Sequence, residues 1–399
     1  MRNFALFWTG QLVSGTGSWM QLVAMAWLVL DISRSPATLG WITTLQFLPI
    51  LLFALPAGVL ADRVSKRGLL IAAQTLAAIQ ALLLGVLATI GTPQIWQLGL
   101  LGFILGVSNA FTYPTQQAFI SELVDPPLVP QAVALNSIQF NITRMVGSAL
   151  GGLAVASFAA GAVFFINAAS FAASLGALLA MRPAQLRTPA VQTARGGALR
   201  EGVNYAVRTP AVLFVLGALA VVGTLGFNWP VAAPLLARDV LGVEAVGLGA
   251  LMAAFGAGAL VAGLALALLG GASERRLVGA GAVLGLVLVM LGLSHSYVLS
   301  LVLMGLAGVS GTVFTTTANT RLQLLSPDRL RGRVMSLFVL FMAGSTPIGA
   351  SLLGISATAF GVPMAMVVFG LATVGGLALL LVWRAASEST RIAAAAQTP

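Results

Sequence analysis

The sequence predicts an all-α polytopic membrane protein, with twelve transmembrane helices in two six-helix, pseudo-symmetric halves. Hydrophobic residues make up 59% of its 399 residues and charged residues 8%, compared with about 25% charged residues in an ordinary soluble domain. The apolar residues run in blocks of roughly 20, enough to span a bilayer, without the alternation of an outer-membrane barrel. These observations exclude a soluble enzyme, and the absence of cysteine excludes a disulfide-stapled secreted domain.

Twelve apolar blocks are long enough to cross a membrane. In order they cover residues 4–31, 37–61, 69–91, 95–121, 130–157, 161–182, 210–237, 245–270, 276–294, 297–323, 331–357 and 361–384. The first block lacks the short apolar core and cleavage site of a signal peptide, so we expect it to be retained as a helix.

The basic residues predict the orientation of these helices. The net charge is +10; of the 20 basic residues, 17 lie in loops or tails on the side of the N-terminus, 2 lie on the other side, and Arg144 lies inside a block. Because basic loops remain in the cytoplasm, both termini are expected there. This placement explains the net charge of +10 without a nucleic-acid partner.

The longest polar stretch, residues 183–209, separates six blocks from six. It contains Pro183, Pro189 and Gly196-Gly197, a linker composition, and Leu199 to Arg208 have the pattern of a short helix on the cytoplasmic leaflet. The predicted units are an N-terminal half (1–182), the linker (183–209), a C-terminal half (210–384) and a cytoplasmic tail (385–399).

An internal repeat relates the two halves. Gly106-Val107-Ser108 recurs as Gly308-Val309-Ser310, an offset of 202 residues, at equivalent positions in the fourth and tenth blocks. Duplicated six-helix halves around a central linker are the layout of an alternating-access transporter.

A charged loop follows the second block, and by itself it suits a positive-inside turn. It resembles the signature loop of the major facilitator superfamily, with Ser65 where that family prefers glycine; the corresponding second-half loop lacks the aspartate. The resemblance implies a conformational latch in which Asp62 stabilises the outward-open state and an acid at the end of the fourth block, Glu122 or Asp125, joins it. Gly58 would allow close approach of another helix. The latch residues are Gly58, Asp62, Arg63, Lys66, Arg67, Glu122, Arg331 and Arg333.

Further segments resemble the enterobactin exporter and macrolide efflux branch of this superfamily, from Phe4 to Trp383. They are Gly10 to Gln21, Ser33 to Pro36, and the run Arg331-Gly332-Arg333-Val334-Met335-Ser336, which by itself also suits a basic helix start at lipid head groups. The resemblance implies a secondary exporter in the inner membrane of a prokaryote.

Small residues in the fifth block are expected to pack closely against a partner helix. They resemble the antiporter motif of the superfamily's exporters, with Ser148 in place of proline. These helix-packing residues are Gly147, Ser148, Gly151 and Gly152.

Arg144 is the one basic residue deep in a block. A charge at the centre of the bilayer costs about 2.5–3.5 kcal/mol even on permissive scales, so it should face a cavity or a partner. Ser137, Asn141, Arg144 and Ser148 form one polar stripe on the helix. Arg144 is therefore either a substrate-facing cation or a structural hydrogen-bond donor to nearby helices.

The resemblance implies that the first, fourth, seventh and tenth helices line a central cavity. Their polar and aromatic residues suit a small amphipathic substrate, and Arg144, with no central carboxylate, favours a neutral or anionic substrate over a cationic drug. The candidate cavity residues are Gln11, Ser14, Ser18, Gln21, Asn109, Tyr113, Asn141, Arg144, Asn228, Trp229, Thr316 and Asn319.

No acidic residue or histidine lies in the middle of a block. If the coupling ion is H+, a carboxylate or histidine must titrate between states, and Asp31, at the end of the first helix, is the candidate. The alternative for Asp31 is a helix-end acid paired with Arg34.

The sequence predicts a monomer in contact with membrane lipid, with no cofactor and no metal site. A single histidine, His295, gives no basis for an enzyme. The alternatives within the fold are an uptake carrier, a lysolipid transporter or a non-transporting receptor.

Overall fold

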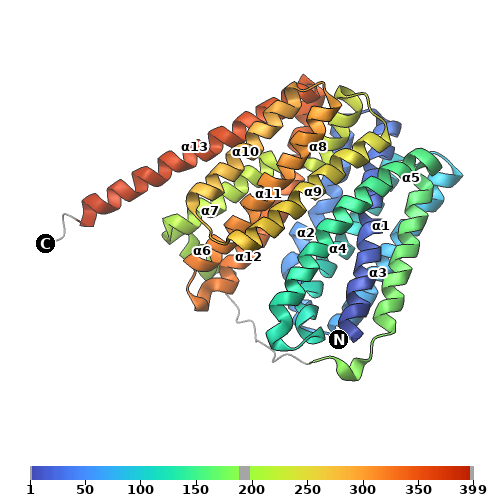
Figure 1. Cartoon of the computed structure of the whole chain (residues 1–399), viewed down its shortest axis with the longest axis horizontal. Helices are drawn as coiled ribbons and strands as arrows, with labels where there is room; N and C mark the ends of the chain where they lie inside the picture. Colours follow the sequence, from blue (N-terminus) through green and yellow to red (C-terminus); the bar gives the residue numbers. More distant parts are fainter. Residues whose placement is uncertain (1, 188–197, 396–399) are drawn as a thin grey trace.

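The computed structural model describes residues 2–187 and 198–395, without the side chains of residues 54, 55, 59, 61, 62, 198–200, 269, 328 and 388–395. The described chain folds into helices, as predicted (Figure 1). They are α1 (Arg2–Ser33), α2 (Pro36–Arg63), α3 (Lys66–Ile90), α4 (Ile95–Leu123), α5 (Val129–Leu179), α6 (Ala198–Arg208), α7 (Pro210–Val221), α8 (Trp229–Leu235), α9 (Ala245–Leu269), α10 (Glu274–Leu293), α11 (Tyr297–Leu325), α12 (Asp328–Phe360) and α13 (Val362–Ala395), with short turns η1 (Pro126–Leu128), η2 (Pro183–Gln185), η3 (Val222–Gly226) and η4 (Leu236–Val240). Residues 188–197 of the predicted linker and 396–399 of the predicted tail lie outside the described residues.

The fifth and sixth predicted spans are joined end to end in α5. Ala159 has φ 63° and ψ 168°, which breaks the helix between the two spans. This region of φ and ψ is one that glycine occupies readily and alanine occupies only with strain. In the described part of the chain, 11 helices are long and apolar enough to cross a membrane when α5 counts once. The break in α5 therefore agrees with the twelve predicted spans.

The seventh predicted span is interrupted rather than continuous. α7 ends at Val221, the π-helical turn η3 follows, and α8 begins at Trp229. Pro230, in the first turn of α8, has no backbone N–H to donate to the preceding turn, so the regular pattern of α-helical hydrogen bonds is interrupted before it. The interruption lies at Phe227 and Asn228, directly before Trp229, so it falls at two of the candidate cavity residues, Asn228 and Trp229.

The bundle has two ends, which differ in what they carry (Figure 1). The linker face is the end with the N-terminus, α6 and the loop between α2 and α3; the far face is the opposite end. The most extensive contacts between the N-terminal half and the C-terminal half are those of α2 with α12 and of α5 with α9. The largest buried apolar cluster also joins the halves, since it includes Val23 and Leu39 together with Leu251 and Leu353.

The predicted short helix of the linker is present as α6, and it packs on α12. Its Glu201 pairs with Arg329 at 3.1 Å and with Arg333. The Tyr205 hydroxyl donates to the carbonyl oxygen of Leu325 at 2.7 Å. Val207, in contrast, is exposed. One face of α6 is thus attached to the C-terminal half.

Candidate functional site

The guanidinium of Arg144 lies in a cluster of aromatic rings between the two halves. Its Cζ is 4.8 Å from the ring centre of Phe255 on α9, 5.7 Å from that of Phe140 on α5 and 5.9 Å from that of Trp19 on α1. Its Nη2 donates to Oδ1 of Asn141 at 2.6 Å. We call Trp19, Phe140, Asn141, Arg144 and Phe255 the Arg144 cluster.

Arg144 is buried without a counter-ion in the described part of the chain. It is 9% exposed, its Nε has no hydrogen-bond partner, and none of the described ion pairs includes it. A cation over an aromatic face gains about 0.5–2 kcal/mol, so the three rings offset part of the cost of burying the charge. The remaining hydrogen-bonding capacity leaves room for an acceptor that the protein itself does not supply.

At the far face, the two halves touch through two pairs of glycines. A Cβ atom built on Gly40 of α2 would lie 3.1 Å from Cα of Gly354 of α12, and one on Gly152 of α5 would lie 2.9 Å from Cα of Gly249 of α9. Gly354 follows Gly152 by 202 residues, the offset of the internal repeat. Equivalent glycines of the two repeats, Gly152 and Gly354, therefore each pack on a glycine of the opposite half.

Hydrogen bonds reinforce the contact between α2 and α12. The Thr44 hydroxyl lies 2.6 Å from Oγ of Ser351 and donates to the carbonyl oxygen of Pro347 at 2.9 Å. The backbone N–H of Ala37 donates to Oγ1 of Thr358 at 3.0 Å. The far face is thus closed by backbone-to-backbone packing and polar contacts between the halves.

At the linker face, the ion pairs among the described residues stay within one half. Nζ of Lys66, the first residue of α3, is 2.7 Å from Oε1 of Glu122 at the end of α4, and both side chains are 12% exposed. Arg67 donates to the carbonyl oxygens of Leu178 and Leu179 at the end of α5. These contacts join α3 to α4 and α5 within the N-terminal half.

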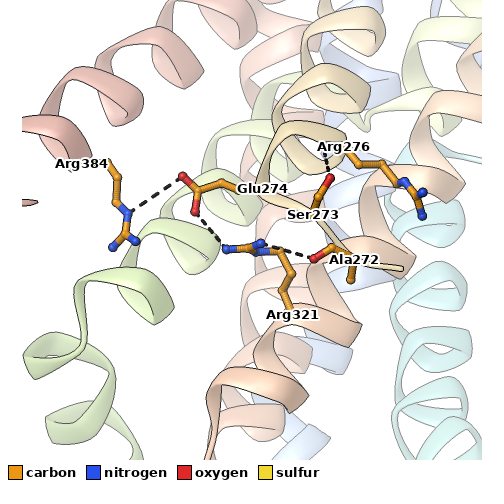
Figure 2. Close-up of polar contacts among 6 residues, drawn as sticks. All are labelled: Ala272, Ser273, Glu274, Arg276, Arg321 and Arg384. Carbon is orange, nitrogen blue, oxygen red and sulfur yellow. Dashed lines mark hydrogen bonds and ion pairs between the residues drawn. The ribbon is translucent and has the colours of Figure 1, made fainter. Parts of the chain in front are cut away.

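The C-terminal half has a corresponding network with the charges reversed (Figure 2). Glu274, the first residue of α10, is 2.9 Å from Nη2 of Arg321 on α11 and 3.9 Å from Nε of Arg384 on α13. In both halves an ion pair joins the start of the third helix to the end of the fourth. The acid lies on the third helix only in the C-terminal half.

Among the described latch residues, Gly58, Arg63 and Arg333 show no contact with the opposite half. A Cβ built on Gly58 would meet nothing within 4 Å, so the expected close approach of a helix is not present. Arg63 is exposed, and the Asp62 side chain lies outside the described residues. Arg333 pairs with Glu201 of α6, while Arg331 donates to the carbonyl oxygen of Gln323 at 3.3 Å.

Comparison with known families accounts for this arrangement. The profile of the family described as "Transmembrane secretion effector" matches residues 1–398. The chain belongs to this family of the major facilitator superfamily. It is a transporter and not an enzyme.

Several curated relatives of this transporter have similar sequences. The Staphyloferrin A transporter of Staphylococcus aureus is 23% identical over 92% of this chain and 93% of its own, and Macrolide efflux protein A of Streptococcus pyogenes is 26% identical over 90% of each. The Enterobactin exporter EntS of Shigella boydii is 27% identical over 81% of this chain and 78% of its own. An uncharacterized transporter, YfiS of Bacillus subtilis, is 28% identical, and the match spans about half of that protein, 49%.

Solved structures confirm the fold of the transporter. A bacterial homologue of the human lysosomal transporter Spinster, in an inward-facing and unoccupied conformation, matches with a TM-score of 0.73 and 14% identity over 96% of each chain. The nucleoside transporter NupG matches with a TM-score of 0.75 and 14% identity, over 96% of this chain and 99% of that one. The predicted major facilitator fold is confirmed.

Three of the candidate cavity residues lie in or next to the Arg144 cluster. Asn141 and Arg144 belong to it, and the ring of Trp229 is 5.4 Å from that of Phe255. Tyr113 is 46% exposed on α4, and Nδ2 of Asn228 donates to the carbonyl oxygen of Thr224.

Other candidate residues hold the transporter's helices together instead. Gln11 accepts a hydrogen bond from Gln116 of α4 at 2.7 Å. Gln21 donates to Gln80 of α3 and accepts from Asn167 of α5, and all three are buried inside the N-terminal half.

The remaining candidate residues have no described contact with the Arg144 cluster. Ser18 donates to the carbonyl oxygen of Ser14 on its own helix. Asn319 accepts from Gln323 on α11, Thr316 is exposed, and Asn109 is partly buried on α4.

The small residues of the fifth span lie against two different helices. A Cβ on Gly147 would lie 2.8 Å from Cβ of Trp19, and one on Gly151 would lie 2.8 Å from Cα of Met20, both on α1. Gly152 packs on α9 of the other half. Ser148 is fully buried and its Oγ has no hydrogen-bond partner.

Asp31 lies at the far face, where its side chain is 71% exposed. Its Oδ1 is 3.9 Å from Nη2 of Arg238, which belongs to the C-terminal half. The pair expected with Arg34 is not among the described ion pairs. Asp31–Arg238 is instead the one described ion pair that joins the two halves.

Sequence reasoning did not select Trp19, Phe140 and Phe255 as site residues. Phe140 lies one helical turn before Arg144, so its proximity could have been read from the sequence spacing. Phe255 lies on a helix of the other half, and nothing in the sequence connects it with Arg144.

Proposed function

We propose that the transporter is a secondary active exporter of an amphipathic small molecule, siderophore-like or macrolide-like, that works by alternating access with proton antiport. The observation that carries this proposal is the pairing of a closed far face with an uncompensated buried cation between the halves. A transporter exposes such a central site to one side at a time.

The orientation follows from the distribution of arginine. With the basic loops in the cytoplasm, the linker face is cytoplasmic and the far face is periplasmic or external. The structure is then the inward-facing state, in a bacterial inner membrane, ready to receive substrate from the cytoplasm. The relatives named Enterobactin exporter EntS and Macrolide efflux protein A support the direction of transport and the substrate class.

Asp31 is our candidate for the coupling acid. Its ion pair with Arg238 joins the halves at the far face. Protonation of Asp31 from the outside removes that attraction and therefore favours the open far face, so closure of this face would depend on the protonation state of Asp31. We expect Asp31→Asn to lose proton-dependent transport.

Everted membrane vesicles test the proposal. Respiration makes their lumen acidic, so an exporter appears as uptake of radiolabelled enterobactin or erythromycin that a protonophore abolishes. Accumulation by right-side-out vesicles would instead indicate an uptake carrier. Uptake of a labelled lysolipid, with neither other probe transported, would indicate a lysolipid transporter and contradict the proposed substrate class.

A further inference from the structure

Several buried hydrogen-bonding groups in and beside the Arg144 cluster have no partner in the described part of the chain. Arg144 Nε is buried and unpartnered, and arginine has no acceptor atom. Trp229 Nε1, which can only donate, is also buried and unpartnered, and its ring packs on the same Phe255. Ser148, one turn beyond Arg144, has a buried and unpartnered hydroxyl. Because the Arg144 and Trp229 groups can only donate, a ligand that satisfies them must supply acceptor atoms, for which oxygen is the common choice.

The cluster is approached from the linker face. Phe140 precedes Arg144 by one turn of α5, on the side nearer Val129 and the linker face, and it is 47% exposed. On the far-face side of Arg144, Gly249 of α9 closes the approach, because a Cβ on it would lie 2.7 Å from the carbonyl oxygen of Ser148 and 2.9 Å from Cα of Gly152. A ligand therefore meets Phe140 before it meets Arg144.

Phe255 is the part of the cluster that belongs to the opposite half. It is 2% exposed, and its ring centre is closer to the guanidinium than those of the other two rings. An anion bound to Arg144 neutralises the charge that attracts this ring. Anion binding would thus weaken a contact between α5 and α9, where the far face must open.

We propose that Arg144 binds an anionic oxygen group of the substrate, such as a carboxylate or an ionised catechol, and that Phe255 is the positioning residue through which its arrival loosens the far face. This proposal rests on the proposed transport function, because it names the substrate class and the trigger of that same site. A neutral ligand of the same shape lacks the charge and does not act as the trigger.

Equilibrium binding tests the first part without a gradient or vesicles. The probes are 2-naphthoate and its neutral isostere 2-naphthamide, and the readout is the thermal unfolding midpoint of the purified full chain in detergent. We expect naphthoate at millimolar concentration to raise the midpoint in the wild type and, by less, in Arg144→Lys, but not in Arg144→Gln. Equal shifts with both probes, no shift with naphthoate, or a shift retained in Arg144→Gln would overturn the proposal.

Cross-linking tests the role of Phe255. Because the chain has no cysteine, Thr44→Cys with Ser351→Cys gives one reporter pair at the far face. Naphthoate should slow disulfide formation in this background. Phe255→Leu should cross-link slowly with or without the probe, whereas Phe227→Leu, whose ring packs on Phe255 but makes no described contact with Arg144, should keep the response. A full naphthoate response in Phe255→Leu would contradict the coupling.

These results separate the inference from the proposed function. Anion binding and loosening of the far face without vesicle transport would refute the exporter and retain the site. Proton-driven export by Arg144→Gln at the wild-type rate would refute the site and retain the exporter.

Discussion

Substitution of Gly249 by alanine should open the far face of the transporter. The new Cβ would lie 2.7 Å from the carbonyl oxygen of Ser148 and 2.9 Å from Cα of Gly152, and both are backbone atoms that cannot rotate away. Favourable heavy-atom contacts need about 3.5 Å, so α9 and α5 must separate by roughly 0.6–0.8 Å. Overpacking of this kind costs about 1–3 kcal/mol. The ratio of closed to open far face should therefore fall by about 5- to 150-fold.

The rate of disulfide formation between Thr44→Cys and Ser351→Cys measures this shift at a distance from the substitution. Gly263→Ala is the matched control, because it lies on the same helix and its Cβ would meet nothing within 4 Å. Both substitutions add the same helix propensity, so the comparison removes that contribution. Equal cross-linking rates in Gly249→Ala and Gly263→Ala would refute the glycine contact as the closure of the far face.

Three further outcomes follow from the geometry. Lys66→Met should lower the free energy of unfolding by about 1–3 kcal/mol, because Glu122 loses its charged partner in a site where both side chains are 12% exposed. Arg63→Met, at an exposed position, is the control and should have little effect. Equal losses of unfolding free energy in denaturant titrations of the two variants would contradict this. Ala159→Gly should raise the free energy of unfolding by about 1 kcal/mol by relieving the strained break in α5, and a lower unfolding midpoint would count against that strain. Asp31→Asn should abolish the dependence of transport on a pH gradient, and unchanged dependence would remove Asp31 as the coupling acid.

The sequence predicts most of the fold because length and apolarity alone decide which segments can cross a membrane. The start of α4 at Ile95 and of α9 at Ala245 agree with the predicted spans. The structure adds two features. The seventh span is broken just before Pro230, and α13 continues as a helix to Ala395, into the residues expected to form the cytoplasmic tail.

The candidate site could be predicted only in part. Arg144 and Asn141 share a helix face, so their spacing reveals the contact. Gln21 has the same polar character, yet its amide contacts Gln80 and Asn167 inside one half, and a single sequence does not distinguish a polar group that faces substrate from one that joins helices. Phe255 reaches the site through the packing of two halves, a contact between residues 111 positions apart.

The central claim is that the far face opens and closes during transport. A disulfide between Thr44→Cys and Ser351→Cys would lock it closed, since the two native side-chain oxygens are 2.6 Å apart and the chain contributes no other thiol. Transport of a probe by everted vesicles should stop on oxidation and return on reduction. If the fully cross-linked protein transports the probe as fast as the protein with its disulfide reduced, alternating access through this face is contradicted.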